Sequence, residues 1–181
     1  MGVLYCMEMI DIYNELGQKC GKTEEKYETH RKGLIHKCVC VWIINSNDEI
    51  LLQTRNNQVM FPNMMDISFS GHIQAGETSL EAAIREGKEE LGIDVEIDKL
   101  QYLFSCREYG GVDGYFENEI DDVFLYRTDI LLDEYSFYDN EVKAVSYVPL
   151  EKFKIMVETN STMLMPYKTH YIFLLTALGM W

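Results

Sequence analysis

The sequence predicts a domain of the α/β or α+β class with a mixed sheet, and three observations lead to this prediction. Apolar and β-branched runs typical of strands dominate the middle of the chain. One strongly patterned helix, residues 78–91, interrupts these runs, and two further helical segments follow near the end. Strands mixed with helices in this order favour a sheet with helices packed against it.

Four short segments before the helix are expected to form strands. Residues 8–13 alternate enough to make a strand, and residues 14–21 carry turn residues. Residues 36–45 form a β-branched run, and residues 49–55 return after the turn sequence NSND, so the two are expected to pair as a hairpin. Residues 65–70 are expected to form another short strand.

The helix over residues 78–91 has clear start and stop signals. Thr78 and Glu81 have the spacing of a capping box, and Gly92 supplies the stop. After it, strands are expected near residues 100–108, 119–127 and 142–148, and helices at residues 150–157 and 167–178.

Composition gives the size and the charge of the domain. The 181 residues are 47% hydrophobic, which is enough to fill one core, so residues 1–181 are expected to form a single domain. The net charge of −14 disfavours binding to nucleic acid or to anionic membrane surfaces. The many carboxylates either form a solvated coat or, where they cluster, bind a hard cation and through it a phosphorylated substrate.

Cysteine usage and the N-terminal segment favour a cytoplasmic protein. The number of cysteines is odd, they are scattered without a CxxC pair, and reduced thiols fit best; they are Cys6, Cys20, Cys38, Cys40 and Cys106. Cys38 and Cys40 alternate with valines and are expected to be small buried side chains. The N-terminal residues have no basic region followed by an apolar stretch, and no run is long enough to span a membrane.

The 78–91 helix has two different faces. An apolar stripe expected to face the core comprises Leu80, Ala83, Ile84, Gly87 and Leu91. Glu86, Glu89 and Glu90 stand at i, i+3 and i+4, so their carboxylates converge and repel one another. A divalent cation such as Mg²⁺ or Mn²⁺ would turn this repulsion into binding energy, whereas the alternative is an ordinary solvated acidic helix.

A glycine-punctuated loop, residues 71–77, precedes the helix. Such a loop lets the backbone approach a ligand closely. Glu77 lies eight positions before Arg85, and an ion pair between the two would lock the loop onto the helix.

Together these residues resemble the Nudix box, G-x5-E-x7-R-E-U-x-E-E-x-G-U, over residues 71–93, where U is a bulky aliphatic residue. Gly87 stands at the first U and is expected to allow close helix packing. The resemblance implies an α/β/α sandwich with a mixed sheet and Mg²⁺- or Mn²⁺-dependent hydrolysis of a nucleoside diphosphate linked to another moiety. It also implies that Glu86, Glu89 and Glu90 hold the metal, that the carbonyl of Gly71 joins the metal shell, that Glu77 and Arg85 orient the loop and helix, and that a carboxylate such as Glu89 or Glu90 takes the proton of the attacking water.

The resemblance extends from about residue 9 to about residue 149 and is closest to isopentenyl-diphosphate isomerase, a relative of the Nudix hydrolases. That enzyme builds a metal site from three histidines and two glutamates, and the corresponding residues are His30, His36, His72, Glu117 and Glu119. Glu117 and Glu119, at i and i+2, would share one face of a strand. Hydrogen-bonded structural roles are the alternative for each histidine.

Two differences favour hydrolysis over isomerisation. Where the isomerase has a catalytic cysteine, two residues before its last metal-binding histidine, this chain has Ser70, whose hydroxyl is a far weaker acid than a thiol. The box glutamates that the isomerase partly lacks are complete here. In addition, the basic residues that follow Arg55 in the isomerase are replaced by Asn56, Asn57 and Gln58. The chain therefore resembles the isomerase-like branch of the Nudix hydrolases.

The substrate-binding residues are less clearly indicated. Arg55 and Lys26 are candidate diphosphate contacts, with exposed charges that bind no ligand as the alternative. An aromatic and apolar wall for a nucleobase is expected from Met60, Phe61, Pro62, Met64, Tyr109 and Tyr115, which could equally be core or loop residues. The apolar segment 165–181 would cover the core or a partner in a homodimer.

Three functions are therefore compared. The first is a metal-dependent diphosphohydrolase acting on a nucleoside diphosphate or a related small molecule, and the second is an isopentenyl-diphosphate isomerase. The third is a ligand sensor without catalysis. Ser70 argues against the second, and the three converging glutamates argue against the third.

Overall fold

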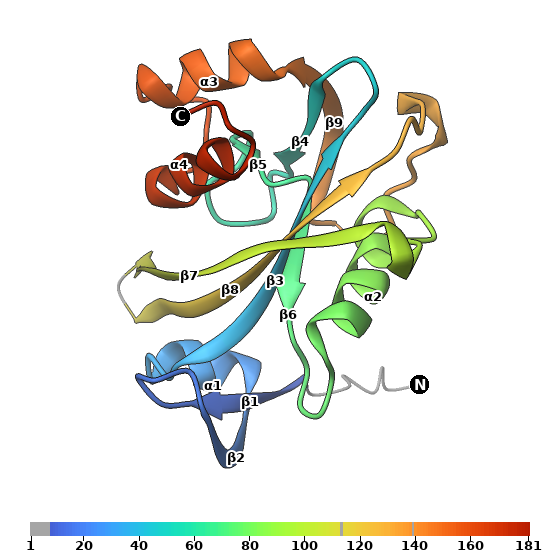
Figure 1. Ribbon diagram of the computed structural model, residues 1–181. Coiled ribbons are helices and arrows are strands. Elements are labelled where there is room, and N and C mark those ends of the chain that lie inside the picture. Colours follow the sequence, from blue (N-terminus) through green and yellow to red (C-terminus); the bar gives the residue numbers. More distant parts are fainter. Residues whose placement is uncertain (1–7, 113, 139) are drawn as a thin grey trace.

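The computed structural model describes residues 8–112, 114–138 and 140–181 of the chain. The elements, in chain order, are β1 Met9–Tyr13, β2 Lys19–Glu25, α1 Lys26–Arg31, β3 His36–Ile44, β4 Glu49–Arg55, β5 Met65–Asp66, β6 Phe69–His72, α2 Ser79–Leu91, η1 Ile97–Lys99, β7 Leu100–Val112, β8 Tyr115–Arg127, η2 Leu132–Glu134, β9 Val142–Pro149, α3 Leu150–Glu158 and α4 Lys168–Ala177. In Figure 1, β1, β2 and α1 lie together beside the start of β3.

The main sheet is mixed, as predicted. Within the described residues its strand order is β5-β4-β3-β8-β7, with β6 paired to β3 and β9 paired to β4. The β3 and β8 strands run parallel, and the other pairs in this sheet are antiparallel. The β3–β8 register sets His36 opposite Glu119, and the β3–β6 register sets Cys38 opposite His72. Three residues far apart in sequence are thereby brought to one end of the sheet.

Helices cover both faces of this sheet, which confirms the α/β/α sandwich. On one face, Trp42 and Leu125 pack with Phe153 of α3 and Leu174 of α4. On the other face, Val41 and Phe69 pack with Ala83 and Leu91 of α2. Figure 1 shows α2 on the opposite side of the strands from α3 and α4. Among the described residues, none of the helices is both long and apolar enough to cross a membrane.

The α2 helix has the predicted caps and one unexpected exposed residue. The Thr78 hydroxyl accepts the N–H of Glu81, the Glu81 carboxylate accepts the N–H of Thr78, and Gly92 adopts a left-handed conformation at φ 69°. A Cβ on Gly87 would lie 2.5 Å from Val95, so glycine is needed for close packing there. Ile84, expected in the core, is 37% exposed, whereas Ala82 is fully buried, so the core-facing stripe is rotated toward Ala82.

Other differences from the predictions concern segments with weak local patterns. The β2 strand was not predicted because its polar sequence KCGKTEE pairs only with β1 and is largely exposed. The six-residue α1 helix has no apolar periodicity either. The predicted 36–55 hairpin is paired at only one position, Ile44 with Ile50, because β3 pairs with β6 over residues 38–41. The strand expected at 65–70 is two strands, β5 and β6.

The described cysteines are free thiols, as expected for reduced residues. Cys38 and Cys40 are buried in β3, which confirms their prediction as small core side chains. Burial raises the pKa of both thiols well above the usual value, so both are protonated at neutral pH. Cys6 lies outside the described residues.

Candidate active site

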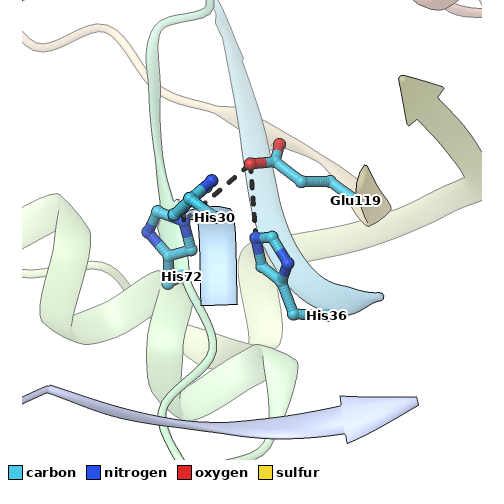
Figure 2. A group of neighbouring side chains, drawn as sticks. All are labelled: His30, His36, His72 and Glu119. Atoms are coloured by element: carbon cyan, nitrogen blue, oxygen red, sulfur yellow. Dashed lines mark hydrogen bonds and ion pairs between the residues drawn. The ribbon is translucent and has the colours of Figure 1, made fainter. Parts of the chain in front are cut away.

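Three histidines and a glutamate from four different elements converge at one end of the sheet. Figure 2 shows His30 from α1, His36 from the start of β3, His72 from the end of β6 and Glu119 from β8. The Nε2 atoms of His30 and His72 are 2.9 Å apart, and Glu119 Oε1 lies 3.4 Å from His36 Nε2 and 3.8 Å from His72 Nε2. One ligand atom from each of the four residues lies within 4.8 Å of every other. This is a spacing that a single bound cation can bridge.

Hydrogen bonds on the far side of two rings orient the cluster. His30 Nδ1 donates to the carbonyl of Phe116 at 3.0 Å, and His36 Nδ1 donates to the carbonyl of Leu34 at 2.9 Å. A neutral imidazole that donates through Nδ1 carries a lone pair on Nε2. The Nε2 atom of His36 is buried and has no hydrogen-bond partner among the described residues. Both rings are therefore held in the tautomer that ligates a metal through Nε2.

The surroundings also favour the protonation states that a metal requires. Burial lowers the pKa of His30, and the nearby His36 strengthens the effect. Burial lowers the pKa of His72 well below its usual value, with Lys26 acting in the same direction. Burial alone would raise the pKa of Glu119, but the nearby His36 and His30 outweigh it and lower that pKa. Neutral imidazoles beside an ionised carboxylate are the ligand forms that bind divalent cations.

Glu117 lies close to this cluster, on the same strand face as Glu119 but outside the group of four. It is two residues before Glu119 in β8, as the alternation of a strand predicts. Burial, assisted by the charge of Glu119, raises the pKa of Glu117 to about 7. Tyr115, a predicted substrate contact, stacks on His30 with ring centroids 4.2 Å apart and planes 9° apart. Its ring therefore supports one of the candidate ligands.

Arg85 in α2 connects the loop and the helix, as the spacing predicted. Its Nε and Nη2 atoms donate to the two carboxylate oxygens of Glu77, each at 2.9 Å. The Nη2 atom also donates to the carbonyl of His72 at 2.9 Å, and Nη1 donates to Glu86 at 2.6 Å and to Glu89 at 3.1 Å. One guanidinium thus contacts three carboxylates, partly offsetting their charge, and fixes the backbone of a histidine in the cluster.

The three box glutamates differ in their surroundings. Glu86 lies against Gly71, so closely that a Cβ at residue 71 would overlap its carboxylate. Burial raises the pKa of Glu86 to about 7, although Arg85 opposes the shift. The Glu89 side chain is 55% exposed at the cavity, whereas Glu90 is buried and accepts the N–H of Ser70 at 3.2 Å.

One cavity of about 780 Å³ contains both groups of residues. Gly71, Arg85, Glu86 and Glu89 line the cavity, and so do His30, His72 and Glu119 of the cluster, together with Glu117 and Tyr115. Neither Glu90 nor His36 is among the lining residues. The volume is that of a site for a small-molecule ligand. All these roles remain predictions, but the cavity brings the two predicted ligand sets together.

The predicted diphosphate contacts also line the cavity, each already paired. Lys26 Nζ lies 3.1 Å from Glu8, and Arg55 donates to Asp66 at 2.6 Å. Among the predicted wall residues, Met60 and Tyr115 line the cavity. The others, Phe61, Pro62, Met64 and Tyr109, are not among the lining residues.

Several lining residues were not identified from the sequence, namely Asp66, Gln74, Glu108, Asp121, Tyr138, Glu141 and Tyr167. Asp121 could have been found, because it continues the i, i+2 alternation of Glu117 and Glu119 on one face of β8. Glu108 requires knowledge of the β7–β8 register, which sets it opposite Glu119.

Fold and site together define a protein of the Nudix class, and comparisons with known proteins agree. The model of the NUDIX domain matches residues 34–166, and the chain belongs to this family. It is 36% identical over 166 residues to Nudix hydrolase 3 of Arabidopsis thaliana, a match that covers 88% of this chain but only 22% of that protein's length. It is 32% identical over 151 residues to an uncharacterised Nudix hydrolase of Listeria innocua, covering 83% of this chain and 85% of the relative. The predicted enzyme class, a hydrolase of pyrophosphate bonds, is confirmed at the level of this family.

The particular branch is also confirmed. The chain is 28% identical over 167 residues to isopentenyl-diphosphate Delta-isomerase 1 of Mesocricetus auratus, covering 84% of this chain and 72% of the isomerase. It is therefore a Nudix protein related to the isomerase branch. A crystal structure of a Deinococcus radiodurans protein has the same fold, with a TM-score of 0.65 and 22% identity over 84% of this chain and 90% of that one.

Proposed function

We propose that the protein is a divalent-metal-dependent hydrolase that cleaves the diphosphate linkage of a nucleoside diphosphate or a related small molecule. The observation that carries this proposal is that one cavity is lined both by Glu86 and Glu89 of the Nudix box and by His30, His72 and Glu119 of the histidine cluster. We further propose that the whole chain acts as one domain.

The donor sets of the two groups fit divalent cations. In the cluster, Nε2 lone pairs converge with a carboxylate, and the buried Nε2 of His36 has no hydrogen-bond partner among the described residues. We assign this site to His30, His36, His72 and Glu119, with Glu117 beside it. We assign Mg²⁺ or Mn²⁺ to Glu86, Glu89 and Glu90, with the Gly71 carbonyl next to them. A cation bound at these residues would neutralise the diphosphate and acidify a bound water.

The remaining residues position the reactants. Arg85 and Glu77 hold the loop and helix in one geometry through their paired hydrogen bonds. We assign proton acceptance from the attacking water to Glu89, because this carboxylate is exposed to the cavity while Glu90 is held by the Ser70 amide. Lys26 and Arg55 would exchange part of their present ion pairs for contacts with the diphosphate.

Isomerisation of isopentenyl diphosphate is the second candidate, because the histidine cluster resembles the metal site of that enzyme. Ser70 lines the cavity at the position where a catalytic thiol would be required. Cys38 and Cys40 also line the cavity, but burial raises the pKa of both thiols. A buried thiol of this kind is a weak acid, so hydrolysis is favoured.

A diphosphate panel distinguishes these functions. The intact chain is incubated with nucleoside diphosphates, nucleotide sugars and isopentenyl diphosphate, with Mg²⁺, with Mn²⁺ or with EDTA. We expect phosphate or nucleotide release that EDTA abolishes and that Glu89→Gln reduces by about 100-fold or more. Conversion of isopentenyl diphosphate to its isomer, without release of phosphate from any compound, would instead establish the second function.

A further inference from the structure

The tyrosine side chains that line the cavity differ in how much of each ring a ligand can reach. They are Tyr115, Tyr138 and Tyr167. The Tyr115 ring is stacked on His30, with ring centroids 4.2 Å apart. Tyr167 is half-buried, and its ring packs against Tyr171 with centroids 6.5 Å apart. Tyr138 is 72% exposed, and no aromatic ring of the described chain stacks on it. Of the three, Tyr138 therefore offers the most ring surface to a ligand.

The segment that carries Tyr138 is anchored on both sides by backbone hydrogen bonds. The N–H of Ser136 donates to the carbonyl of Leu91, the last residue of α2, at 3.0 Å. On the other side, the N–H of Asn56, which follows β4, donates to the carbonyl of Glu141 at 2.8 Å. These bonds hold the segment between the end of α2 and the end of β4. They place the Tyr138 ring at the cavity although the ring itself is exposed.

The Tyr138 ring also lies beside the end of the helix that carries the candidate metal ligands. A Cβ on Gly92 would stand 3.1 Å from Cε2 of Tyr138, so the ring lies against the backbone at the C-cap of α2. Glu89, whose side chain lines the cavity and is 55% exposed, precedes Gly92 by three residues, about 4.5 Å along the helix axis. A diphosphate held by a cation at Glu89 would leave the remainder of its molecule within reach of the Tyr138 ring.

We propose that Tyr138 is a stacking platform for the base of a nucleoside diphosphate, an inference that rests on the proposed function. A flat phenol ring pairs well with a flat base, and such stacking tolerates any base because every base has a π face. A prenyl chain has no π face to offset against the ring, so it gains only apolar contact. Tyr138 therefore favours nucleotides over prenyl diphosphates without selecting one base.

Binding of analogues that resist hydrolysis tests the platform separately from catalysis. The probes are the α,β-methylene analogues of ADP and UDP, and methylenediphosphonate, which has neither ribose nor base. Each is titrated with Mg²⁺ into the intact chain by calorimetry. Tyr138→Ala should weaken binding of both nucleotide analogues by about ten-fold and leave that of methylenediphosphonate within about two-fold of wild type.

Two further variants separate stacking from other contacts. Tyr138→Phe keeps the ring and should retain the wild-type affinity for the nucleotide analogues. Tyr138→Leu keeps an apolar side chain without a π system and should lose affinity as Tyr138→Ala does. The comparison of Tyr138→Phe with Tyr138→Leu decides alone if methylenediphosphonate binds too weakly to be measured.

The control is Tyr102→Ala, which removes an exposed ring of β7 outside the cavity and should change no affinity. Thermal unfolding identifies a variant that fails to fold, and the remaining variants then decide. The inference is overturned if neither nucleotide analogue binds, if Tyr138→Ala binds them as wild type does, if Tyr138→Phe and Tyr138→Leu behave alike, or if methylenediphosphonate loses as much affinity as the nucleotides.

Hydrolysis of ADP and UDP, measured in parallel, distinguishes this inference from the proposed function. Stacking binds the ground state and the transition state alike, so Tyr138→Ala should raise KM by about ten-fold with kcat unchanged. Turnover with no loss of nucleotide affinity in Tyr138→Ala refutes only the platform. Ring-dependent nucleotide binding without turnover refutes the hydrolase and retains the platform.

Discussion

Two of the box glutamates of α2 and three residues of the histidine cluster line the same cavity, but the two groups are assembled in different ways. The glutamates come from one helix, and a single guanidinium, that of Arg85, contacts both Glu86 and Glu89. The histidine cluster is drawn from four elements, and its geometry depends on the pairing of β3 with β6 and β8. The first group is organised by local charge pairing, and the second by the topology of the sheet.

Arg85 is also where the two groups meet, because its Nη2 atom donates to the carbonyl of His72. A substitution of Arg85 should therefore disturb both groups, whereas a substitution within one group should leave the geometry of the other group unchanged. Four predictions follow this distinction, from the largest expected effect to the smallest.

Removing the guanidinium is expected to have the largest effect. Arg85→Met leaves Glu77 and Glu86 without their cation and releases the His72 carbonyl, so kcat/KM should fall by about 100- to 1000-fold. Steady-state hydrolysis of the best diphosphate measures kcat/KM, and thermal unfolding measures the stability of the variant. The matched control is Arg127→Met at an exposed position in β8, which should change neither. Full activity in Arg85→Met would show that the two groups do not depend on this link.

Gly71→Ala tests the glutamate group alone. The added Cβ would overlap the carboxylate of Glu86 and must displace it, so we expect kcat/KM to fall by about 100-fold while metal binding at the histidine cluster persists. Gly110→Ala is the milder comparison, because its Cβ would stand 3.3 Å from Glu117 Oε2 and small movements relieve the contact. Equal effects of the two substitutions would contradict the special role of the Gly71 contact.

The contrast between a group built on one helix and a group built from four elements explains which parts of the site were predictable from the sequence. The α2 helix, its caps and the Glu77–Arg85 pair were predictable because their signals lie within fifteen residues. The four-element histidine cluster was predicted only through a family resemblance. Periodicity contains no information on which strands pair, and the contacts of His36 with Glu119 depend on a parallel register. Glu108 on the cavity wall was missed for the same reason, whereas the α1 helix that carries His30 was missed because its six residues have no apolar periodicity.

His36→Gln tests the histidine group alone. The substitution removes a buried Nε2 lone pair without adding charge, so affinity for Mn²⁺ or Zn²⁺ at one site should fall by about ten- to 100-fold in calorimetric titrations. The remaining histidine, His170, provides the control, since its Nε2 accepts the Trp42 N–H. His170→Gln should lower the melting temperature and leave metal affinity unchanged. Equal metal binding by wild type and His36→Gln would exclude the cluster as a metal site.

Asp122→Asn tests how the two groups are held relative to each other, with the smallest expected effect. Asp122 accepts hydrogen bonds from Lys37 of β3 at 2.9 Å, from Ser79 of α2 at 2.5 Å and from Ser105 of β7 at 2.6 Å. It thereby ties the start of the glutamate helix to the strand that begins with His36. Burial alone would raise the pKa of Asp122, but the bonds from Ser105, Ser79 and Lys37 outweigh burial and lower it below 3.8.

Because the pKa of Asp122 is lower in the folded state than in the unfolded state, its ionised form stabilises the protein above about pH 4, and this stabilisation is lost as the pH falls through the folded-state pKa. Asp122→Asn should therefore lower the free energy of unfolding by about 1 to 2 kcal/mol at pH 7. The difference from wild type should shrink when urea unfolding is repeated toward pH 3. A difference that stays constant over this range would mean that Asp122 contributes through packing and not through its charge, and that other contacts align the helix with the sheet.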